Sequence, residues 1–108
     1  MLPQDVVTEL KRLTEEIRKG SSALYDAEVK LAHSEHELDT VEQTAFIRSE
    51  GTVADRNALS KLESSQERLQ RDLAKAELNR IRMKVKGLES AVMATQTMSR
   101  LLEMEARL

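Results

Sequence analysis

The chain has 108 residues, of which 33% are charged, 40% are hydrophobic and 2% are aromatic. This length is typical of one domain, and we predict a single helical domain over residues 1–108. Three glycines and one proline are too few for the many turns of a β-barrel, and the lack of cysteine excludes a disulfide scaffold. The composition indicates an all-α protein whose long helices pack against one another.

The net charge of −2 conceals an uneven distribution. Residues 1–55 carry 6 Lys/Arg and 12 Asp/Glu, whereas residues 56–108 carry 11 Lys/Arg and 7 Asp/Glu. The basic second half indicates a surface for nucleic acid, or else a basic helix that pairs with an acidic neighbour. Both explanations remain open at this point.

Apolar residues recur at steps of three and four along the first half of the chain. This spacing keeps one seam on one side of a helix, as coiled coils require. Lys19-Gly20 is typical of a helix end, and Ser21 or Ser22 of a new start. We therefore predict an N-terminal helix over 4–19 and a first hairpin arm over 22–49, although the unbroken register also allows a bend at Gly20. The seam consists of Val6, Leu10, Leu13, Ile17, Leu24, Ala27, Leu31, Leu38, Val41 and Ala45, with Gly20 and Ser34 at the two remaining positions.

A tight turn is predicted after Arg48. Gly51 ends the first arm, and Thr52 is placed to cap the next helix. The carboxylate of Asp55 is favourable near the positive, N-terminal end of that helix's dipole. A short connection of this kind makes the two helices antiparallel neighbours. The second arm is predicted over 53–107, and its seam is expected at Leu62, Leu69, Leu73, Ala76 and Met83, with Arg80 among them.

The end of the second arm predicts self-association. Residues 90–99 carry no charge, and a helix without a charged face over nearly three turns is buried on several sides. A two-helix hairpin cannot supply that burial alone, unless residues 4–19 cover the stretch. We therefore predict a homo-oligomer whose interface includes Val92, Met93, Met98, Leu101 and Leu102.

A row of cations on the second arm is the main chemical feature. On a helical wheel the six fall within an arc of roughly 80°, away from the predicted seam. Such a row can follow a nucleic-acid backbone by displacing its counterions, and the scarcity of aromatic side chains makes sequence-independent phosphate contacts the expected mode. A solvated face paired with the acidic arm is the alternative. The row consists of Lys61, Arg68, Arg71, Lys75, Arg82 and Lys86.

No motif of catalysis is present. The sequence lacks a glycine-rich phosphate loop, a nucleophile elbow and a Ser/His/Asp grouping, so we predict no enzymatic activity and no cofactor. His33 and His36 have a helical spacing that metal sites use, but no further ligand cluster accompanies them, so no metal site is predicted. The absence of a signal sequence and of a long apolar run predicts a cytoplasmic protein without a membrane anchor.

The middle of the chain resembles the UvsY-type recombination mediators of bacteriophages. The similar residues are Leu24-Tyr25-Asp26-Ala27-Glu28, the run from Ser49 to Arg56, and the end from Leu88-Glu89 to Ser99-Arg100-Leu101-Leu102. The resemblance implies an all-helical oligomer that binds single-stranded DNA and helps a recombinase to displace a single-strand binding protein. Family members tend to carry basic residues on the helix that enters the turn, whereas residues 41–48 here have one Arg against one Glu. From the family we carry over Arg48 and Arg56 as DNA contacts.

Two functions follow as expectations. The first is a phage recombination mediator that holds single-stranded DNA on the basic row. The second is a coiled-coil protein–protein adaptor, or a phage-encoded inhibitor of a host protein, in which the acidic arm matters more (Glu28, Glu35, Glu37, Asp39).

Overall fold

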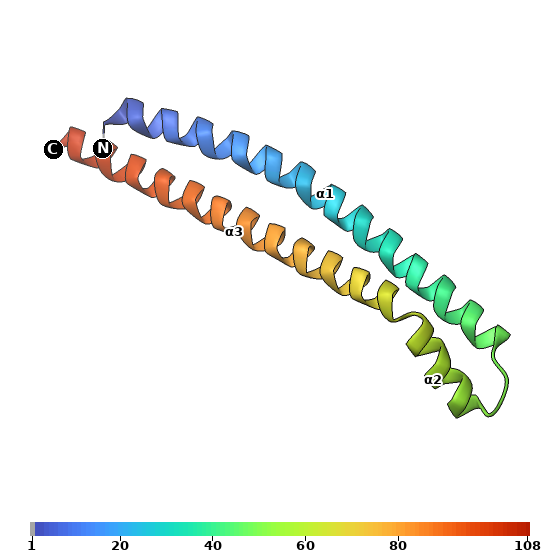
Figure 1. Cartoon of the computed structure of the whole chain (residues 1–108). Helices are drawn as coiled ribbons and strands as arrows, with labels where there is room; N and C mark the ends of the chain where they lie inside the picture. Colours follow the sequence, from blue (N-terminus) through green and yellow to red (C-terminus); the bar gives the residue numbers. More distant parts are fainter. Residues whose placement is uncertain (1) are drawn as a thin grey trace. The chain divides into compact units, whose positions relative to one another are not determined.

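The computed structural model describes residues 2–108 and contains three α-helices: α1 (Pro3–Arg48), α2 (Val53–Glu63) and α3 (Ser65–Arg107). No strand is present in the part of the chain that it describes. The connection at 49–52 reverses the chain, so that α2 and α3 return antiparallel to α1 (Figure 1). The predicted all-α helical hairpin is confirmed.

The turn forms as its residues predict. Gly51 has a φ of 111°, a left-handed backbone conformation that favours glycine. Thr52 is the N-cap of α2, and its hydroxyl oxygen accepts a hydrogen bond of 3.2 Å from the backbone N–H of Asp55. The second arm therefore begins at Val53, as expected.

The predicted break at Gly20 is wrong. One helix runs from Pro3 to Arg48, in place of separate helices over 4–19 and 22–49. Gly20 is needed for close packing instead, because a Cβ built on it would lie 2.9 Å from Cγ2 of Val85 on α3. A glycine in the seam thus lets the two helices approach, and the register that continues across it belongs to a continuous helix.

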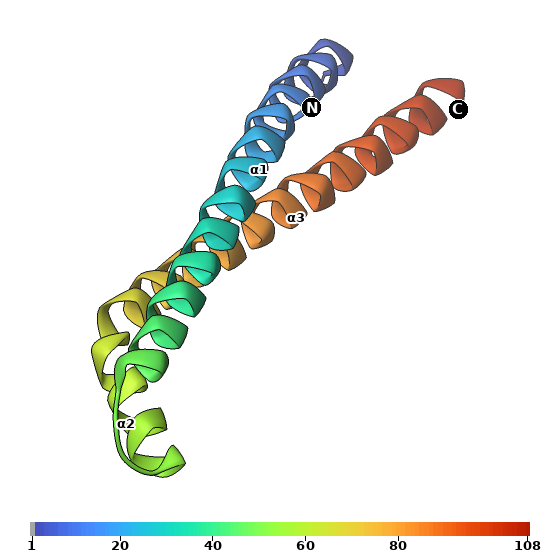
Figure 2. The same cartoon turned by 90° about the vertical axis from the view of Figure 1, so that its right-hand side faces the viewer.

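The predicted uninterrupted second arm is also wrong, because a bend at Ser64 separates α2 from α3. Figures 1 and 2 show α2 set at an angle to the start of α3. The Ser64 hydroxyl donates a 2.7 Å hydrogen bond to the carbonyl of Ser60, a side-chain bond within the helix that favours bending. Backbone bonds still cross the bend, from Ser64 N–H to Ser60 and from Arg68 N–H to Ser64.

The chain forms two compact units along these helices. In one, residues 2–24 pack on residues 80–108, with Val6 and Leu13 buried. In the other, residues 25–79 surround a core that includes Ala27, Leu38, Ala45, Ala74 and Leu78. The predicted seam of α1 is confirmed in both units, since every member is buried or half-buried.

On the returning helices the predicted seam is wrong. Leu62, Leu69, Leu73 and Met83 are between 51% and 74% exposed. We call the residues that do face α1 the inner seam, and they include small and polar side chains. Two ion pairs form when this face is turned to α1: Lys30 Nζ lies 3.3 Å from Glu77 Oε2, and Arg68 Nη2 lies 3.5 Å from Glu42 Oε2. The inner seam consists of Ser60, Ser64, Glu67, Arg71, Ala74 and Leu78 in one unit, and Ile81, Val85, Leu88, Val92, Thr95 and Leu102 in the other.

The glycines of the two long helices predict opposite effects of the same substitution. Gly87→Ala is expected to stabilise the protein by about 0.5–1 kcal/mol, because alanine favours the helix and no atom lies within 4 Å of the added Cβ. Gly20→Ala has the same helical gain but forces Val85 aside, at a cost of about 1–3 kcal/mol. Urea unfolding of the two variants measures the difference, and equal gains would show that α1 does not approach Val85 closely.

Candidate nucleic-acid interface

The basic row lies along one edge of the inner seam. Lys61 is on α2, and the other five cations are on α3. Lys61, Arg68, Lys75 and Arg82 recur at every seventh residue, each directly after a seam residue, whereas Arg71 is itself part of the seam. The row is therefore beside the helix contact, which corrects the expectation that it lies away from it.

Arg68 is held by three neighbours. Its Nη1 donates to the carbonyl of Lys61 at 3.2 Å, and its Nη2 lies 3.2 Å from Ser64 Oγ and 3.5 Å from Glu42 Oε2. Its side chain is 32% exposed. Arg68 thus ties the bend at Ser64 to the acidic face of α1, and much of its hydrogen-bonding capacity is used within the protein.

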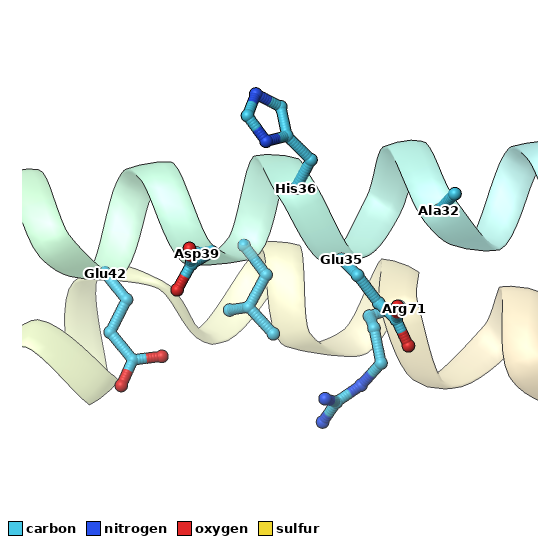
Figure 3. Close-up of a pocket in the computed structure, with 7 residues that line it drawn as sticks. Ala32, Glu35, His36, Asp39, Glu42 and Arg71 are labelled. Atoms are coloured by element: carbon cyan, nitrogen blue, oxygen red, sulfur yellow. The ribbon is translucent and has the colours of Figure 1, made fainter.

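Arg71 borders an open pocket of about 590 Å³ between α1 and α3, within the unit of residues 25–79. Its Nε donates to Asp72 Oδ1 at 2.8 Å. Figure 3 shows Glu35 and Glu42 extending from α1 toward the helix that carries Arg71. The pocket also includes Asp39, so its surface combines one guanidinium with three carboxylates. An arginine in this setting is poorly placed to hold a phosphate, because the neighbouring carboxylates repel the anion.

The lysines of the row have a different environment. Lys61 and Lys75 are exposed in one unit and Lys86 in the other, and Arg82 is also exposed. Across residues 2–108, no ion pair involves Lys61, Lys75 or Lys86. These three ammonium groups are the members of the row that are open to an external anion.

The two arginines taken from the family resemblance lie near the turn, where Arg56 has a structural role. Its Nε and Nη2 donate to the carbonyl of Phe46 at 3.2 and 2.9 Å. Its Cζ is 4.2 Å from the centre of the Phe46 ring, a cation–π contact. Arg56 thereby joins the start of α2 to the end of α1. Arg48 is exposed and lines a small cavity that Glu63 also borders.

The acidic side of this interface was underestimated from the sequence. Glu28, Glu35 and Glu42 recur at every seventh residue of α1, the same interval as the cations opposite. That matched interval was the available signal, because residues seven apart share one face of a helix. The alternative of a basic row paired with the acidic arm is confirmed for Arg68 and Glu42.

The residues of the predicted oligomer interface divide between two environments. Val92 and Leu102 are half-buried on the inner seam. Leu102 borders a groove of about 460 Å³ together with Val6 and Leu10 of α1. Met93, Met98 and Leu101 are 67%, 43% and 54% exposed. The continuous α1 thus covers one side of the uncharged stretch, and the three other residues remain accessible.

Other chemistry has little support in the side chains. His36 points away from the pocket that it borders (Figure 3). Among residues 2–108, no three His, Asp or Glu side chains are grouped as metal ligands, and none of the helices has an apolar stretch of the length that a membrane span requires.

Two carboxyl groups on α1 are held by neighbouring arginines. A hydrogen bond from Arg12 lowers the pKa of Glu9, and a hydrogen bond from Arg18 lowers the pKa of Glu15. Both pairs link successive turns of one helix.

Comparison of the chain with protein-family models, with curated proteins and with solved structures finds no match.

Proposed function

We propose that this protein is a non-enzymatic recombination mediator that binds single-stranded DNA without sequence preference. The observation that supports the proposal is the exposed, unpaired state of Lys61, Lys75 and Lys86 along the basic row. Ammonium groups in such a row attract phosphates by displacing counterions. Arg48, also exposed, adds positive charge near the turn.

Binding is expected to depend on phosphate contacts, and repetition of the row in an oligomer compensates for the small number of cations. Tyr25 and Phe46 are the only aromatic residues, and the Phe46 ring is occupied by Arg56, so base stacking contributes little. A homo-oligomer repeats the row, and linked weak contacts raise the overall affinity. By the family resemblance, the protein partners are a recombinase and a single-strand binding protein, in the cytoplasm of a bacterial host.

A coiled-coil adaptor or inhibitor that docks on a host protein is the second candidate. The pocket at Glu35, Asp39, Glu42 and Arg71 favours it, because three carboxylates beside one guanidinium suit a basic protein segment better than DNA. This function predicts negligible DNA binding near physiological salt.

Charge reversal of the exposed lysines distinguishes the two functions. The triple variant Lys61→Glu, Lys75→Glu, Lys86→Glu is expected to lose at least about tenfold in affinity for a single-stranded oligonucleotide, and the wild-type affinity is expected to fall steeply with salt. Fluorescence anisotropy at two salt concentrations measures both effects.

The matched control reverses three cations of α1: Lys11→Glu, Arg18→Glu, Lys19→Glu. Both variants have the same net charge, so a loss confined to the first assigns binding to the row rather than to the overall field. If the two variants lose affinity equally, the assignment of binding to the row is wrong, and if the wild-type protein does not bind at low salt, the DNA-binding proposal is wrong.

A further inference from the structure

The returning helices have a second apolar face, which α1 leaves uncovered. Its residues follow the same alternation of three- and four-residue steps as a coiled-coil seam. At about 100° per residue, this face is roughly 150° from the inner seam. We call it the outer stripe: Leu59, Leu62, Gln66, Leu69, Leu73, Ala76, Arg80, Met83, Gly87, Ser90, Ala94, Thr97 and Leu101.

Large side chains on the outer stripe are accessible in each unit. Leu62, Leu69 and Leu73 are 70%, 51% and 56% exposed in the unit of residues 25–79, and Met83 is 74% exposed in the other. A regular apolar seam exposed to this extent is typical of a surface that another helix covers.

The charges beside the outer stripe change sign along it. Glu63, Asp72 and Glu77 border its first part, whereas Lys84, Lys86 and Arg100 border its later part. Two copies that run in opposite directions bring the acidic part of one against the basic part of the other. The stripe is therefore complementary in charge to a second copy of itself.

Opposite directions also suit the shapes of the side chains. With Glu77 of one copy beside Lys84 of the other, the large residues of the first part meet the small residues of the later part. A Cβ on Gly87 would have no atom within 4 Å, so the backbone there is open to a neighbouring helix. In this register, Leu69 faces Ala94 and Leu73 faces Ser90 of the other copy, and pairs of a large and a small side chain fill such an interface. Ala76 faces Gly87, where the two helices can approach closely.

Parallel pairing in register is unfavourable on the same face. It sets Arg80 against the Arg80 of the other copy in the centre of the stripe. It also brings Asp72 close to the other copy's Glu77, a repulsion between flanking residues that sets the orientation of coiled coils.

We propose that two copies of this chain associate antiparallel through their outer stripes, with α3 packed against α3. The inference names the self-association surface that the proposed mediator would use, but it does not rest on DNA binding. Of the basic row, only Lys86 also borders the outer stripe, so the double variant Lys61→Glu, Lys75→Glu distinguishes loss of DNA binding from loss of the dimer.

Cysteine cross-linking tests the direction of pairing, because the natural chain has no cysteine. A mixture of a Leu73→Cys variant and a Ser90→Cys variant is expected to form a disulfide-linked heterodimer on oxidation, whereas neither variant alone forms a linked homodimer. Linked homodimers of Leu73→Cys alone would indicate parallel pairing and would overturn the proposal.

Light scattering on the full chain tests the dimer itself. The wild type is expected to have at least twice the mass of one chain, and the double variant Leu69→Glu, Leu73→Glu the mass of one chain. Both substituted residues are exposed, so circular dichroism is expected to show unchanged helix content. A wild type that is monomeric at 100 µM, or a double variant that keeps its partner, would contradict the outer-stripe interface.

Discussion

Leu78→Ala is expected to lower the free energy of unfolding by about 2–5 kcal/mol, the range for a leucine removed from a packed core. Leu78 lies on the inner seam of α3 and is 3% exposed. Leu73→Ala is the matched control, because Leu73 is on the same helix but 56% exposed. Its cost is expected to stay within about 0.5 kcal/mol in the monomer.

Urea unfolding followed by circular dichroism measures both variants. The lowest workable protein concentration is required, since association through the outer stripe would add concentration-dependent stability to the wild type and not to Leu73→Ala. A larger loss for Leu73→Ala than for Leu78→Ala in the monomer would mean that α1 packs on the outer stripe, as the sequence alone had predicted.

Ser64→Leu is expected to destabilise the protein by about 1–3 kcal/mol or more, because the added volume has no space to occupy. Ser64 has no exposed surface, and its hydroxyl bonds to the carbonyl of Ser60. The substitution also removes the Oγ that lies 3.2 Å from Arg68 Nη2. Ser65→Leu is the control, since the adjacent serine is exposed.

Thermal unfolding of the two leucine variants gives the comparison. The Ser65→Leu variant is expected to differ little from the wild type, as is usual for surface substitutions. If Ser64→Leu is as stable as Ser65→Leu, the bend between α2 and α3 does not hold Ser64 against α1, and the description of this junction is wrong.

The turn and the start of α2 could be predicted because the sequence signals for them lie in adjacent residues. The glycine at Gly51 and the cap at Thr52 require only a few adjacent residues, and they fix where α2 begins. The seam of α1 was also predictable, since only one regular apolar stripe runs along that helix. Gly20 was misleading because its role depends on Val85, which is distant in sequence.

The second arm was harder because it carries two regular stripes. Over residues 59–79 the outer one holds four leucines, so apolar content alone favours it there, whereas the inner seam includes Ser60, Ser64 and Glu67. Over residues 80–108 the inner seam is the more apolar of the two, and the charges opposite each stripe are known only once the two helices are aligned. The same uncertainty affects the cations: Arg68 and Lys75 are equivalent on a helical wheel, yet only Arg68 is paired with Glu42.

The two stripes on one helix have a consequence for folding. While the hairpin forms, α1 meets two faces of nearly equal length, and over residues 59–79 the face that it must avoid offers the larger apolar side chains. Two of the contacts that favour the native face are the ion pairs Lys30–Glu77 and Arg68–Glu42, which docking of α1 on the outer stripe would separate. Each partly exposed pair of this kind contributes at most about 1 kcal/mol, so the search is directed to the native face by several small preferences that agree with one another.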